Sequence, residues 1–220
     1  MFKKVLIASA MLVSVVGANA IGFGVSGVIN PSSCTITLSG SGLADYGTLI
    51  AATVKGYTQT FPSLYDLGDK PLNYNVACSA PTKVAFSFID AQAGKVMTGD
   101  SNDASRYGLV NGSTGTTTIG HYELIVNTAA LDGVAANASL TTVNGGSAWS
   151  LSGPTGRAAN FAAPGYTVGF IKAAGTATPD AATTIAGVMN FRTRVSKALV
   201  DAATTPITLN GAGTLSLVYL

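Results

Sequence analysis

IGFGVSGVINPSSC, residues 21–34, is the stretch that decides the fold of this chain. Apolar or small residues alternate through it: Ile21, Phe23, Val25, Gly27 and Ile29. A period of two is the pattern of a β-strand that buries one face. A strand at the start of a secreted chain has no preceding hairpin to hold it. We therefore predict that it pairs with a distant segment or with another molecule.

The same stretch also contains a G-x-G-x-x-G motif, formed by Gly22, Gly24 and Gly27. In dinucleotide-binding folds this motif follows a strand and opens a helix. Here Pro31 and Cys34 follow where the helix should begin. The glycines are therefore better explained as the small face of a strand against which another backbone segment packs closely.

Residues 1–20 have the features of a signal peptide. Lys3 and Lys4 form a basic start, residues 5–17 are mostly apolar, and Ala18-Asn19-Ala20 fits an A-x-A cleavage site. The apolar run is too short to span a bilayer, and no later segment is long and apolar enough to do so. We expect export through the inner membrane and no integral membrane segment.

Charge argues against two classes of partner. The chain has 12 basic residues, and without Lys3 and Lys4 the remaining ten balance the 10 acidic residues. Nucleic acids and anionic membranes are bound through basic patches. A neutral mature chain therefore indicates no nucleic-acid partner.

Cys34 and Cys78 are the only cysteines. An even number in an exported protein predicts a disulfide, with two buried free thiols as the alternative. Together with His121, the single histidine, they do not make a four-ligand zinc site. We expect no metal and no cofactor.

The rest of the chain is predicted to be all-β. Rows of alternating apolar residues recur: Leu72-Tyr74-Val76-Cys78, Val84-Phe86-Phe88, Tyr122-Leu124-Val126, Tyr166-Val168-Phe170, Met189-Phe191-Thr193-Val195 and Leu215-Leu217-Tyr219. Short strands with Gly-rich turns favour a single sandwich or barrel domain. Between Met97 and Pro164 the pattern degrades, and we expect a loop-rich insertion with one or two edge strands.

Catalysis is poorly supported by the sequence. There is no G-x-S-x-G motif, and His121 beside Gly120 is interpreted as an exposed edge residue. The chain is therefore not expected to be an enzyme. Trp149 is a candidate for stacking on a sugar, but the favoured interpretation is a plug against the core.

Several of these motifs together resemble subunits of chaperone–usher fimbriae. They are the Val25-x-Gly27-x-Ile29 stretch before Cys34, the strand that Cys78 closes, Val84-x-Phe86-x-Phe88, and the penultimate Tyr219. The nearer likeness is to a fimbrial-like family of Gram-negative exported proteins labelled only as a domain of unknown function. Its members end in a similar T-L-x-L-x-Y-L.

This resemblance implies an immunoglobulin-like, pilin-type sandwich over residues 34–220 that lacks its last strand. Residues 21–33 would be an N-terminal extension whose donor strand fills the groove of another subunit. In that extension Ile21, Phe23, Val25 and Ile29 would insert, with Gly27 where the groove has no room for a Cβ. The strand from Thr214 to Leu220 would form one groove wall, and its chaperone-contacting residues would be Leu215, Leu217 and Tyr219.

The implied partners are a periplasmic chaperone, an outer-membrane usher and other fimbrial subunits. The implied location is the periplasm in transit, then the fimbrium or cell surface. The extension before Cys34 is shorter than expected for a shaft subunit, so a minor or non-polymerising subunit stays open. The alternative function is a self-complete exported sandwich that binds a glycan or a protein at the cell surface.

Overall fold

The computed structural model describes residues 27–28, 30–59, 61–97, 106–112, 115–142, 146–151 and 166–220, without the side chains of residues 127 and 128. The chain divides into two units, Met1–Pro31 and Ser32–Leu220, and the fold below is that of the second. The predicted signal peptide lies outside the described residues.

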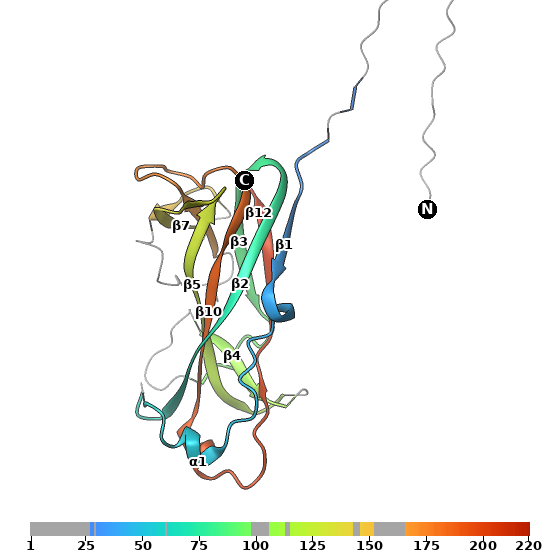
Figure 1. Ribbon diagram of the computed structural model, residues 1–220. Helices are drawn as coiled ribbons and strands as arrows, with labels where there is room; N and C mark the ends of the chain where they lie inside the picture. The colour runs from blue at the N-terminus through green and yellow to red at the C-terminus, as the bar shows by residue number, and fades with distance from the viewer. Residues whose placement is uncertain are drawn as a thin grey trace, which may run out of the picture. The chain divides into compact units, whose positions relative to one another are not determined.

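The second unit is an all-β sandwich, as predicted, and its two sheets are antiparallel (Figure 1). Among the described residues, the first sheet has the order β1-β2-β10-β5-β4-β11, with β6 paired to β5. The second sheet has the order β12-β3-β9-β7-β8. The strands are β1 (Cys34–Leu38), β2 (Leu64–Thr82), β3 (Val84–Asp90), β4 (Arg106–Asn111), β5 (Thr118–Leu131), β6 (Val134–Ala135), β7 (Ala138–Thr142), β8 (Ser150–Leu151), β9 (Thr167–Ile171), β10 (Ala182–Ser196), β11 (Leu209–Asn210) and β12 (Gly213–Tyr219).

In the described part of the chain, three short helices lie between the strands: η1 (Ser39–Gly42), α1 (Ala51–Val54) and α2 (Lys197–Asp201). The Ser196 side chain caps α2 by accepting the N–H of Leu199 at 3.4 Å. A side-chain oxygen at this position satisfies one of the free N–H groups of the first turn.

The core lies between the sheets and is centred on Phe86 of β3. Its ring packs edge-to-face against Tyr74 and Phe170, with centroid distances of 5.3 and 5.7 Å. Such pairs stabilise a core beyond the area they bury. The alternating rows of the sequence thus become the inward faces of the strands.

The prediction of a loop-rich insertion between Met97 and Pro164 is wrong for the residues that the structure describes there. β5 pairs with both β10 and β4, and β7 pairs with both β8 and β9, so these two strands lie inside their sheets. The tract's small residues hide this in the sequence. At Gly120 of β5, a Cβ would collide with the carbonyl oxygen of Arg194 on β10. Glycine here permits close strand packing and does not mark a loop.

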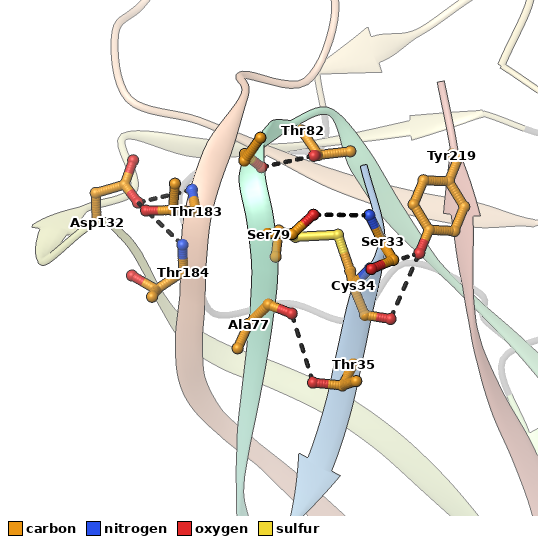
Figure 2. The surroundings of a disulfide bond; sticks show 12 residues. Ser33, Cys34, Thr35, Ala77, Ser79, Thr82, Asp132, Thr183, Thr184 and Tyr219 are labelled. Atoms are coloured by element: carbon orange, nitrogen blue, oxygen red, sulfur yellow. Dashed lines mark hydrogen bonds between the residues drawn. A yellow bond between two sulfur atoms is a disulfide. The ribbon is translucent and has the colours of Figure 1, made fainter. Parts of the chain in front are cut away.

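The predicted disulfide is confirmed. Cys34 of β1 and Cys78 of β2 are directly paired in the ladder and are joined through their sulfur atoms, with Cα atoms 4.0 Å apart (Figure 2). The bond closes a loop between residues 44 positions apart in sequence. It therefore ties the edge strand β1 to the sheet.

Replacing both cysteines, as Cys34→Ala with Cys78→Ala, should lower the free energy of unfolding by about 2–5 kcal/mol. The cause is the loss of a constraint on the unfolded chain. Urea unfolding measures it, with the reduced wild type as the matched control. An unchanged unfolding midpoint in both samples would contradict the assignment.

Candidate functional site

The two sheets are open along one side of the sandwich, where the edge strands β1 and β12 lie side by side. Among the described strands, β1 pairs only with β2, and β12 pairs only with β3. The Tyr219 hydroxyl of β12 lies 2.7 Å from the backbone nitrogen of Cys34 in β1 (Figure 2). We call this side the β1–β12 seam.

The free edge of β1 has backbone groups that point into the seam. Antiparallel ladders alternate between pairs that exchange hydrogen bonds and pairs that do not. Ser79 donates its N–H to the Ser33 carbonyl at 2.9 Å, so the next pair, Cys34 with Cys78, does not exchange bonds. The N–H and C=O groups of Cys34, Ile36 and Leu38 therefore point away from β2.

The same argument applies to β12. Ala91 donates its N–H to the Ala212 carbonyl, and Leu220 donates its N–H to the Lys83 carbonyl. The pairs between them alternate. The backbone groups that face the free edge are therefore those of Gly213, Leu215, Leu217 and Tyr219.

The inward side chains along the seam are only half-buried. Ile36 and Leu38 of β1, and Leu215 and Leu217 of β12, pack against the core but remain partly exposed. In the central strand β2, by contrast, Val76 is 0% exposed. The seam thus combines unpaired strand edges with incompletely covered apolar side chains.

A cavity of about 340 Å³ opens along the seam. Its walls come from the chain after β1, from the core, and from β11 and the start of β12. Its lining residues are Leu38, Gly42, Leu43, Ala44, Tyr46, Phe88, Tyr107, Leu109, Tyr122, Leu124, Met189, Phe191, Thr193, Leu209, Asn210, Gly211, Ala212, Gly213, Thr214 and Leu215. None of these described lining residues is charged, and none is a histidine or cysteine, so the lining is uncharged and consists of apolar side chains with a few tyrosine, threonine and asparagine side chains.

Aromatic rings form the floor of this cavity. Tyr122 stacks on Tyr107 and on Phe191, with centroid distances of 5.1 and 6.0 Å. A Cβ at Gly211 would come within 2.5 Å of the Tyr122 ring, so only glycine lets the backbone cross there. Burial raises the pKa of the Tyr107 phenol, whose hydroxyl has no hydrogen-bond partner among the described residues.

Tyr46 holds the loop that forms the opposite wall. Its hydroxyl lies 2.8 Å from the carbonyl oxygens of Gly68 in β2 and Phe191 in β10. Burial raises the pKa of this phenol, so the hydroxyl keeps its proton. The wall is thereby fixed to the sheet.

The structure brings some of the predicted site residues together. Leu215, Leu217 and Tyr219 lie on β12, as expected, and Tyr219 meets Cys34. The predicted donor-strand residues Ile21, Phe23, Val25 and Ile29 lie outside the described residues. Gly27 is described, without regular secondary structure.

Sequence reasoning missed the aromatic floor and the Tyr46 wall. Tyr122 and Phe191 were recognised only as strand residues, and Tyr107 and Tyr46 were not singled out. The cavity forms from strands distant in sequence, so no local pattern indicates it. The one usable signal was the alternation of Tyr122 and Phe191 with polar neighbours.

The expectation that His121 is an exposed edge residue is wrong. Its side chain is 0% exposed, because β5 lies inside the sheet. The imidazole Nδ1 lies 2.7 Å from the Met97 carbonyl oxygen, and Nε2 lies 3.4 Å from Arg194 Nη1. Nδ1 therefore donates its hydrogen and Nε2 accepts, which is the neutral form.

Two arginines surround this histidine. The guanidinium carbons of Arg106 and Arg194 lie 4.9 and 5.1 Å from the ring centre of Phe61. Arg194 also donates to Glu123 at 2.6 Å and to Asp66 at 3.3 Å. Burial lowers the pKa of His121, and the two arginine cations lower it further, against the opposing effects of the Met97 hydrogen bond and Glu123.

The stability of the fold should fall as the pH drops below about 6.5, the ordinary pKa of histidine. The unfolded chain then binds a proton at His121 that the folded chain excludes, so the free energy of unfolding rises with pH in this window. We expect the free energy of unfolding to be about 1 kcal/mol lower at pH 5.5 than at pH 7.5. A single titrating group can change it by at most about 1.4 kcal/mol per pH unit. Denaturant unfolding at several pH values measures it.

His121→Gln is the matched control, because it keeps an uncharged polar side chain that does not titrate. Its free energy of unfolding should be flat over the same window, whatever its absolute value. Equal slopes for the variant and the wild type would contradict the role given to His121.

A family model described as a protein of unknown function (DUF1120) matches residues 23–136. The chain belongs to this family. The match covers just over half of the chain and includes β1, β2 and both cysteines of the disulfide. No curated protein and no solved structure matches the chain.

Trp149 packs against the small buried cluster of Ala138, Leu140 and Ile171, which is the favoured plug arrangement. No helix within the described residues is long and apolar enough to cross a membrane.

Proposed function

We propose that this member of the family is a structural subunit of the fimbrial kind, exported to the periplasm and completed by a strand from a neighbouring molecule. The observation that carries the proposal is the β1–β12 seam. On both edges, backbone groups point away from their own sheet, and half-buried leucines lie between the edges. A β-strand that docks in the seam would form backbone hydrogen bonds with both edges and would also cover the leucines.

The occupant that we propose is residues 21–29 of a second copy. This segment has the alternating apolar face that the seam requires, and it has no charged residue, like the cavity lining. Nine extended residues span about 30 Å, enough to cover the seven residues of β12. Length, apolar pattern and charge therefore all fit.

An uncovered seam is a hazard before assembly. Unpaired strand edges and exposed apolar side chains promote aggregation. A periplasmic chaperone that covers the seam, followed by transfer at an outer-membrane usher, would protect the subunit in transit. Ser32–Leu220 would then be the acceptor and residues 21–29 the donor.

A labelled peptide of residues 21–30, titrated with the full chain, tests the proposal. We expect saturable binding, measured by fluorescence anisotropy. Leu215→Arg should weaken it by at least about tenfold, because a charge on the buried face of the seam is desolvated without a partner. Leu151→Arg is the matched control: Leu151 is 67% exposed on β8, at the other edge of the same sheet.

A peptide that is N-methylated at alternate backbone positions distinguishes backbone hydrogen bonding to the seam from non-specific binding. The protein itself is not altered in this test. The methylated peptide should bind at least about tenfold more weakly, because it lacks the N–H donors for one edge. Equal binding of both peptides contradicts the proposal. Absence of binding, with a monomeric chain whose residues 21–29 resist proteolysis, favours the self-complete surface-binding sandwich instead.

A further inference from the structure

Tyr219 bridges the two edge strands at the disulfide end of the seam. Its hydroxyl accepts the N–H of Cys34 at 2.7 Å and donates to the Cys34 carbonyl oxygen at 3.4 Å (Figure 2). These are the first backbone groups on the free edge of β1. The Tyr219 side chain therefore occupies the hydrogen-bonding position beside Cys34 that a docked strand would otherwise use.

Both ends of this bridge are anchored. Cys34 is held by the disulfide to Cys78. Tyr219 pairs with Val84 of β3, and the next residue, Leu220, donates its N–H to the Lys83 carbonyl at 3.1 Å. The bridge therefore has no freedom to slide along the seam.

The cavity stops short of the bridge. It is lined by Leu38 of β1 and Leu215 of β12, whereas Ile36 and Leu217 lie beyond its lining. This cavity therefore lies at the Gly213 end of the seam and does not reach Tyr219.

We propose that the Tyr219 hydroxyl sets the end point of a docked strand. The strand pairs with β12 from Gly213 to Leu217 and stops at Tyr219. This inference rests on the proposed function and specifies its ligand: about five extended residues, or about 17 Å, form the paired part. A short donor segment is then sufficient to fill the site.

Tyr219→Phe tests this directly, because it removes only the hydroxyl and keeps the ring. Peptides from residues 21–30, shortened one residue at a time from each end, are titrated against the full chain. In the wild type, affinity should stop rising at about five residues, the length of the paired part. In the variant it should continue to rise, with the longest peptide gaining about three- to tenfold, the effect of one further hydrogen bond.

Tyr57→Phe, which removes a hydroxyl next to α1, is the matched control and should follow the wild type. An identical length dependence in the wild type and Tyr219→Phe overturns the inference while the proposed function stands. Failure of every peptide to bind either protein overturns both.

Amide hydrogen exchange gives a readout that needs no peptide. The Cys34 amide should exchange at least about threefold faster in Tyr219→Phe than in the wild type, because its acceptor is gone. The Thr35 amide, which faces β2, should not change. An unchanged rate at Cys34 overturns the inference.

Discussion

The structure depends on one constraint, the need of every buried backbone N–H and C=O group for a partner. In β1 and β12 the sheet ladder meets this need on one side only, because each is the edge of its sheet, and on the other side Tyr219 bonds to the backbone of Cys34. Water satisfies the exposed edges, but it does not cover the leucines between them. We propose that a further strand does both, because without one the leucines along the seam stay partly exposed. The cavity, its aromatic floor and the bridge from Tyr219 to Cys34 all border the seam.

The remainder of the molecule holds the seam in a fixed shape. The disulfide fastens β1 to β2, the aromatic core fixes β3, and Tyr46 ties the loop wall to two carbonyl groups. A groove formed before binding lowers the ordering cost of docking, since only the incoming strand must lose freedom. The cluster around His121 plays a different part. It links β5 and β10 through the ion pair between Glu123 and Arg194 and contributes no residue to the cavity.

The sequence was informative wherever large apolar residues alternate. The rows around Val76, Phe86 and Leu217 predicted strands, and an even number of cysteines in a chain expected to be exported predicted the disulfide. The row Tyr122-Leu124-Val126 predicted the strand β5 but not its place inside the sheet, where Gly120 packs closely against Arg194 of β10, and the sequence of β7, ASLTT, has no row of large apolar residues that would predict it. The burial of His121 follows from the pairing of β5 with both β10 and β4, which is visible only in the fold. The seam itself follows from strand order, which local patterns do not determine.

The most direct test of the account is the amide hydrogen exchange of β12 in the isolated chain. If the seam is open, exchange alternates along the strand: the amides of Leu215 and Leu217 exchange at least about tenfold faster than those of Ser216 and Val218, which bond to β3. Adding the peptide of residues 21–30 should then protect Leu215 and Leu217. Uniform protection of all four amides in the isolated chain would contradict the account, because the edge would already be paired.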